Sequence, residues 1–152
     1  MKREEIQRAV KEAVLDVFEN MYFMFPELIA EDDPGPSLTE SCFKARIAVQ
    51  NGSEVLVLYA SEQLVADMAK NLLGAEQPIA ETDLIDVFKE TANVIAGNLI
   101  TGLALDSSIA FDVPVAEKLQ PCLEPHTDSD AHEVIFNIDE GFFKVAVVSP
   151  NT

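Results

Sequence analysis

Two strand-like runs joined by a tight turn constrain the fold of this chain more than any other feature. In residues 43–49 large or apolar side chains alternate with Lys44, Arg46 and Ala48, and residues 54–60 (EVLVLYA) carry an unbroken apolar run after Glu54. Between them lie Asn51 and Gly52, two residue types that tolerate the positive φ angles of a short hairpin. The pattern therefore predicts a pair of antiparallel strands, and the unbroken run predicts that both faces of the second strand are covered.

Helical periodicity flanks this hairpin on both sides. Apolar residues recur there at three- and four-residue spacing, which builds one continuous apolar face on each helix. Ser61 can cap the helix that follows the hairpin, and Gly74 can end it. Three helices are predicted in this way, at residues 3–23, 62–74 and 82–105.

The last third of the chain adds further strands. Strand patterns occupy residues 107–115, 132–138 and 142–149, with a turn at 139–141 between the last two. Residues 116–131 are polar and rich in proline, which is typical of a loop. This order of elements predicts an α+β fold in which an antiparallel sheet packs against long helices. The length suits one domain that spans residues 1–152.

A short internal repeat links the first and the third predicted helix. Residues 14–18 read VLDVF and residues 84–88 read LIDVF. Strand patterns follow both helices, so we interpret the chain as a duplicated helix-plus-strands unit. The copies differ downstream of the match, because Asn20 stands where the second copy has Glu90, and Phe23 stands where it has Asn93.

One side of the third helix carries a polar stripe. At roughly 100° per residue, Asp86, Glu90, Asn93 and Gly97 fall within roughly 60° of one another around the helix axis. A solvated helix face also looks polar, but asparagine and glycine are poor helix formers, and both are unusual choices for a merely solvated face. The apolar residues lie broadly on the opposite side: Phe88, Ala92, Ile95, Leu99 and Leu103.

Charge and composition exclude several functions. The formal net charge is −17, so nucleic acids and anionic membranes are poor partners for this chain. No apolar run reaches the roughly 18 residues of a membrane span, and the charged start lacks a signal-peptide core, which together predict a cytoplasmic protein. Cys42 and Cys122 are the only cysteines. A disulfide is possible, but two unrelated free thiols are the favoured interpretation.

The polar stripe carries a resemblance to a known family. The segment DVFKETANVIAGN is similar to the signature helix of the CheC/CheX/FliY family of chemotaxis phosphatases, in which Asp or Ser, Glu and Asn recur at fixed spacing and a proline follows. Asp86, Glu90 and Asn93 fit that pattern, and Pro114 falls slightly early for its proline. The family is built from a duplicated unit. Because this chain keeps Glu and Asn only in the second copy, it resembles the one-site CheX branch, which implies a homodimer.

The resemblance implies a reaction and roles for individual residues. Family members hydrolyse the aspartyl phosphate of a CheY-like response-regulator receiver domain, which supplies the phosphorylated Asp, a lysine and a bound Mg²⁺, so this chain itself is expected to bind no cofactor. Asn93 would orient the attacking water, because an amide both donates and accepts hydrogen bonds. Glu90 would pair with the receiver's lysine. Asp86, Gly97, Asn98 and Pro114 are expected to contact the partner.

Three alternatives to this prediction differ in kind. A CheX-like module could bind a receiver or another signalling protein without turnover. Nucleophilic hydrolysis lacks support, because no serine lies in a G-x-S-x-G turn and neither cysteine has a catalytic setting. A metal site in residues 126–133 is the third, although the spacing of its ligands matches no zinc or EF-hand pattern, so no metal is predicted. The potential ligands there are His126, Asp128, Asp130, His132 and Glu133.

Overall fold

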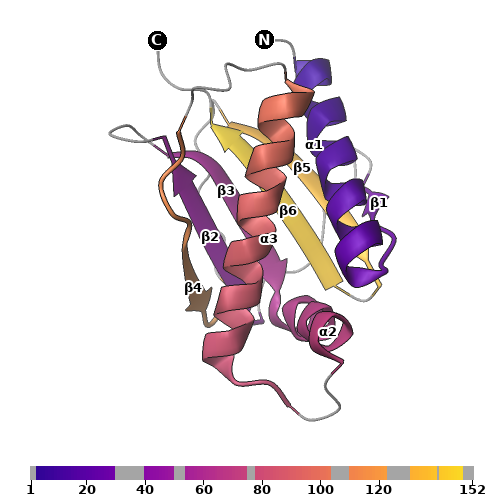
Figure 1. Ribbon diagram of the computed structural model, residues 1–152, viewed down its shortest axis with the longest axis vertical. Helices are drawn as coiled ribbons and strands as arrows, with labels where there is room; N and C mark the ends of the chain where they lie inside the picture. The colour runs from indigo at the N-terminus through magenta and orange to yellow at the C-terminus, as the bar shows by residue number, and fades with distance from the viewer. Residues whose placement is uncertain are drawn as a thin grey trace.

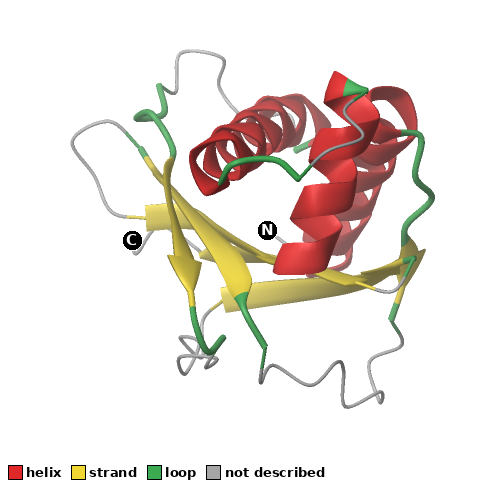
Figure 2. Cartoon of the chain, turned by 90° about the horizontal axis from the view of Figure 1, so that it is seen from below, coloured by secondary structure: helices red, strands yellow, loops and turns green. Residues whose placement is uncertain are grey.

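The computed structural model shows two layers, a six-stranded antiparallel sheet and helices that cover one of its faces (Figures 1 and 2). It describes residues 3–29, 40–49, 54–74, 78–103, 110–122, 131–139 and 141–148. The predicted α+β class is confirmed. The helices are α1 (Arg3–Val17), continued by the π-helix η1 (Phe18–Tyr22), α2 (Glu62–Leu73) and α3 (Glu81–Gly102). The strands are β1 (Glu27–Leu28), β2 (Cys42–Ala48), β3 (Glu54–Ser61), β4 (Val115–Leu119), β5 (Ala131–Ile138) and β6 (Gly141–Val148).

The strand order carries the duplication that the internal repeat predicts. The order is β1-β5-β6-β3-β2-β4, and every neighbouring pair is antiparallel. Exchanging α1-β1-β2-β3 with α3-β4-β5-β6 reproduces this order in reverse. The short edge strand of each unit therefore pairs with a long strand of the other, so neither unit forms a complete sheet alone.

The core lies between the helices and the sheet, and α1 packs beside α3 (Figure 1). Phe18 and Phe88, the last residues of the repeated five-residue match, are both fully buried. Their rings lie 5.1 and 6.3 Å from the ring of Phe143 on β6, both edge to face. The sequence match therefore marks equivalent core positions of the two units.

Strand β3 is covered on both faces, as its unbroken apolar run predicts. Leu56 and Leu58 belong to the core under the helices, whereas Val57 and Tyr59 belong to a second buried cluster on the other face. The hairpin that joins β2 and β3 is antiparallel with Ala45 opposite Leu58. Its predicted turn at Asn51 and Gly52 lies outside the described residues.

The helix ends differ slightly from the predicted ones. Gly74 ends α2 in the left-handed conformation, with φ of 65°, as its position predicts. Ser61 occupies the N-cap position of α2, but its hydroxyl accepts a hydrogen bond from the N–H of Phe142 and caps nothing. Helix α3 begins at Glu81, one residue before the predicted Thr82. No helix among the described residues is long and apolar enough to cross a membrane.

The predicted strand at residues 107–115 is wrong in its described part. There Phe111 forms an isolated bridge to Val49, and only Val115 belongs to a strand, β4, the rest of which lies in the segment expected to be a loop. Pro114 has no N–H to donate to a ladder, so pairing with β2 starts after it. A polar edge strand such as β4 gives little apolar signal, because none of its side chains is fully buried.

The prediction of two free thiols is also wrong, because Cys42 and Cys122 form a disulfide. Strand β4 lies antiparallel to β2 with Leu119 opposite Cys42. Beyond β4 the N–H of Cys122 donates to the carbonyl of Glu40 at 2.6 Å, and the two cysteine Cα atoms lie 5.3 Å apart. The pairing depends on β4, which the sequence pattern does not reveal.

The segment considered for a metal site is only partly described. Residues 126–130 lie outside the described part, and His132 and Glu133 belong to β5. Glu133 pairs there with the nearly buried Lys144 at 2.9 Å. Within the described ranges no three His, Cys, Asp or Glu side chains gather as potential metal ligands.

Candidate active site

Helix α3 separates an apolar and a polar face as the sequence predicts. Phe88, Ala92 and Ile95 are fully buried against the sheet and the neighbouring helices. Asp86, Glu90, Asn93 and Gly97 are exposed along the opposite side. The polar stripe therefore faces solvent, and the burial of the apolar face holds it in place.

A groove forms where this stripe meets the segment before β4. Its volume is about 350 Å³, and it opens widely to solvent. Four of the six predicted site residues line it, namely Asp86, Glu90, Asn93 and Pro114. The remaining lining comes from four residues that the sequence analysis did not single out: Lys89, Phe111, Asp112 and Val113. Their only signal in the sequence is adjacency to Glu90 and to Pro114.

The second wall of the groove is tied to the sheet rather than to α3. The N–H of Asp112 donates to the carbonyl of Ala48 at 2.9 Å, and Phe111 forms its bridge with Val49. Pro114 is buried, whereas Val113 is 76% exposed. The groove therefore has a backbone-anchored wall that presents an apolar side chain to solvent beside the polar stripe.

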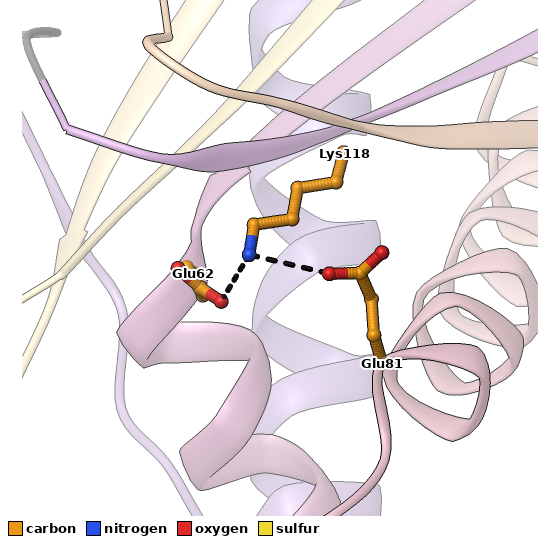
Figure 3. A network of polar contacts seen from close by, with 3 residues as sticks. All are labelled: Glu62, Glu81 and Lys118. Carbon is orange, nitrogen blue, oxygen red and sulfur yellow. Dashed lines mark ion pairs between the residues drawn. The ribbon is translucent and has the colours of Figure 1, made fainter.

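A three-residue ion-pair network joins β4, the strand that follows the wall, to the starts of α2 and α3 (Figure 3). The Nζ atom of Lys118 on β4 lies 2.9 Å from Glu62 at the start of α2 and 3.2 Å from Glu81 at the start of α3. Hydrogen bonds to Glu62 and Glu81 raise the pKa of Lys118, so it stays charged at neutral pH. Because Glu62 and Glu81 lie in the first turns of their helices, their negative charges also interact favourably with the positive ends of the helix dipoles.

A buried hydrogen bond supports α3 from behind the groove. The hydroxyl of Tyr22, at the end of η1, bonds to the hydroxyl of Thr91, and both residues are fully buried. Thr91 itself donates to the carbonyl of Val87 at 2.8 Å. Burial raises the pKa of Tyr22, and the charge of Glu90 adds to this, while the bond to Thr91 acts in the opposite direction. The end of η1, in the first copy, thus contacts the helix that carries the polar stripe.

The groove is acidic, which limits its chemistry. Among the described lining residues, Asp86, Glu90 and Asp112 face a single cation, Lys89. The described lining contains no serine, cysteine or histidine, so it shows no hydroxyl–imidazole or thiol–imidazole pair. What it offers is a carboxylate and an amide one helical turn apart, which can bind a cationic group and orient a water.

The two other predicted contact residues lie outside the groove. The side-chain amide of Asn98 donates to the carboxylate of Asp16 on α1 at 3.3 Å. Asn20 donates to the other oxygen of that carboxylate at 2.8 Å. Gly97 is exposed one turn beyond Asn93 and does not line the groove.

A larger cavity of about 830 Å³ lies elsewhere, between α2 and the start of α3. Glu62, Lys70, Leu84 and Pro121 are among its lining residues, and none of the six predicted site residues is. Its described lining also includes Glu40, Gln63 and Gln120, but it lacks the residues of the polar stripe, and Glu62 is engaged by Lys118. The smaller groove therefore remains the candidate site.

Comparisons with known proteins agree with this fold. A family model described as chemotaxis phosphatase CheX matches residues 45–137, a range that includes the whole groove. A chemotaxis protein CheX from Vibrio vulnificus superposes with a TM-score of 0.73 at 12% identity, covering 97% of this chain and 98% of that chain. A chemotaxis protein CheX from Desulfovibrio desulfuricans gives 0.68 at 17% identity, with 93% and 97% covered.

A third solved structure is a CheX–CheY–BeF3–Mg²⁺ complex from Borrelia burgdorferi. It matches with a TM-score of 0.58 at 18% identity, covering 93% of this chain and 95% of that chain. At these identities the structural matches establish the fold alone. No curated protein matches the sequence.

Proposed function

This chain belongs to the CheX family of chemotaxis phosphatases, and from that membership we propose that it hydrolyses the aspartyl phosphate of a CheY-like receiver domain. One observation carries the proposal. Glu90 and Asn93 lie on a continuous helix, exposed and within one turn of each other, in a groove that also contains Pro114. With Asp86 these residues correspond to the family signature, in which Pro114 falls slightly early for the proline, and here all four line a single groove.

In this proposal Asn93 positions the attacking water. Phosphoryl transfer asks little covalent chemistry of the protein, because most of the barrier is lowered by alignment and by stabilisation of charge. An uncharged amide can accept a hydrogen bond from the water and donate one to the phosphoryl group. A carboxylate in the same place would repel the phosphoryl group, so Asn is better suited there than Asp.

Glu90 anchors the receiver in this proposal. A receiver domain presents a lysine and a bound Mg²⁺ next to its phosphorylated Asp, and the acidic groove complements both. Glu90 is one turn from Asn93, with Cβ atoms at about 5–6 Å for this spacing, so a lysine held by Glu90 would place the phosphoryl group near the amide. Asp86 and Asp112 add negative charge beside this point.

The metal belongs to the partner in this proposal. As the family resemblance implies, the catalytic Mg²⁺ would arrive with the receiver and would not be bound by this chain alone. The Borrelia burgdorferi structure is a complex of a CheX with a CheY, BeF3 and Mg²⁺. That complex supports a receiver as the partner to test, and the homodimer implied by the CheX branch stays a prediction.

The test measures phosphate loss from a phosphorylated receiver with Mg²⁺ present. Asn93→Ala is expected to lower the acceleration by about 10²-fold or more while receiver binding stays within a few fold, because the water loses its alignment and the docking surface remains. Asn20→Ala is the matched control, since Asn20 is an exposed asparagine of the first copy that bonds only to Asp16. Equal turnover by wild type and Asn93→Ala would refute the catalytic assignment.

The same experiment separates the enzyme from a non-catalytic module. Binding of the phosphorylated receiver without faster phosphate loss, in wild type as in Asn93→Ala, would favour a module that only docks. Glu90→Ala is expected to weaken binding as well as turnover, because it removes the anchor for the receiver's lysine.

A further inference from the structure

Gly97 lies in the interior of α3, and nothing in the described part of the chain requires a glycine there. The helix runs from Glu81 to Gly102, so Gly97 is well within it. Glycine is markedly less favourable than alanine at such a position, because its backbone loses more freedom on folding. Its φ angle is not positive, unlike that of Gly74, so the backbone conformation does not require glycine.

Packing does not require it either. Apart from its chain neighbours and the adjacent backbone of its own helix, a Cβ atom added to Gly97 would meet no described atom within 4 Å. Gly141 shows the contrast, because a Cβ there would lie 2.6 Å from the hydroxyl of Ser61 and 2.8 Å from Leu64. The fold therefore explains the glycine at 141 and leaves the glycine at 97 unexplained.

The place of Gly97 on the helix indicates what it is for. It lies four residues after Asn93 on the same exposed side, whereas Glu90 lies three residues before Asn93. A partner that brings a phosphoryl group to Asn93 must lay its adjacent surface over the helix about one turn to either side, where neighbouring positions are about 5–6 Å away. On one side that surface meets Glu90, and on the other it meets the bare backbone of Gly97.

We propose that Gly97 is a docking point for the receiver, at which a backbone segment beside the receiver's phosphorylation site approaches α3 within the space that a side chain would fill. The inference rests on the proposed function and extends its binding surface beyond the groove. In this arrangement the surface runs from Asp86 to Gly97, and Gly97 sets how closely the phosphoryl group can approach Asn93. Asn98 lies next to it but is held by Asp16, which keeps its side chain on α1.

Three variants test this inference. Gly97→Ala adds one methyl group, Gly97→Leu adds a bulky side chain, and Gly102→Ala adds the same methyl group in the same helix on another side. At Gly102 the added Cβ lies in ordinary contact with Ala9, at 3.5 Å. Binding is measured with a receiver domain phosphorylated by acetyl phosphate in the presence of Mg²⁺, phosphate loss is measured in parallel, and thermal unfolding of each variant is recorded.

Gly97→Ala is expected to raise the melting temperature and to weaken receiver binding several-fold, while Gly97→Leu weakens it tenfold or more. The melting temperature rises because alanine favours the helix and has free space there. The change should appear in KM or Kd before kcat, and Gly102→Ala should leave both near wild type.

Undiminished binding by Gly97→Leu would overturn the inference, as would a fall in melting temperature for Gly97→Ala, since that would reveal a structural role. The proposed function fails separately, if wild-type protein binds the phosphorylated receiver but does not accelerate phosphate loss. In that case the effect of Gly97→Leu on binding still decides the docking point.

Discussion

One buried hydrogen bond can be removed by substituting either of its two partners, and the two substitutions should lower the unfolding free energy by different amounts. The bond joins Tyr22 and Thr91, both of which are fully buried. The single hydroxyl proton of Thr91 is used toward the carbonyl of Val87 at 2.8 Å. Tyr22 must therefore be the donor and Thr91 the acceptor, which fixes the direction of the bond.

The direction of the bond determines how much stability each substitution costs. Tyr22→Phe removes the donor and leaves Thr91 with its bond to Val87, so it should cost about 1 kcal/mol of unfolding free energy. Thr91→Val leaves the Tyr22 hydroxyl buried with a donor that has no acceptor, and this should cost about 2 to 3 kcal/mol. The double variant has no orphaned donor, so it should lose less than Thr91→Val alone, or at most about the same.

The assay is urea unfolding of the four proteins under one redox condition, analysed as a double-mutant cycle. A coupling free energy of about 1 to 2 kcal/mol is expected, with a double variant that is more stable than the sum of the single losses implies. Additive losses, or a larger loss for Tyr22→Phe than for Thr91→Val, would refute the assigned direction of the bond.

Two further predictions concern pH and redox state. Burial and the charge of Glu90 raise the pKa of Tyr22 above its ordinary 10.0, so the neutral phenol contributes its full stability below about pH 10, and that contribution falls as the pH rises above it. Urea unfolding on either side of pH 10 should show a fall in unfolding free energy that Tyr22→Phe abolishes. An identical fall in the variant would contradict the assignment of this pH dependence to Tyr22. The disulfide joins residues 80 apart, so loop-closure entropy predicts that Cys42→Ser with Cys122→Ser lowers the unfolding free energy by at most about 4 to 5 kcal/mol. Reductant should lower the melting temperature of wild type but not of the double variant. An unchanged melting temperature of wild type in reductant would contradict this prediction.

Local patterns predict the parts of the fold whose residues bury one face. The third helix is found within a few residues of its ends because Phe88 and Ile95 recur with helical spacing, and burial is what holds α3 in place. The two faces of β3 follow from an unbroken apolar run in the same way. In both cases the side chains that pack in the core and stabilise the element also produce its apolar sequence pattern.

Long-range pairing leaves no such pattern. Strand β4 gains its order from β2 and from the ion pairs of Lys118, not from an apolar face of its own. The disulfide and the anchored wall of the groove both depend on that pairing, so they are missed together with it. Pro114 was predicted through the family signature, but Asp112 and Val113 had no signal beyond their place beside it.

The residues of the candidate site could be predicted where a local pattern is sufficient. Asp86, Glu90 and Asn93 belong to one helix, so their exposure on one side follows from the helical period alone. Asn98 shows the limit of that argument. It is close to the stripe in sequence, yet its side chain binds Asp16 on α1, because two helices pack side by side there.

The two copies of the unit differ in a way that explains why the polar stripe of the candidate site forms only in the second copy. In the second copy the helix continues past residue 93 to Gly102, so an amide at 93 is held one turn from Glu90. In the first copy the α-helix ends at Val17, and η1 ends with Phe23 in the left-handed conformation at φ of 57°. A residue at position 23 therefore cannot share a regular helical face with position 20, whatever its side chain. The buried Tyr22 immediately before that break bonds to Thr91, so the first copy has become a support for the helix of the second.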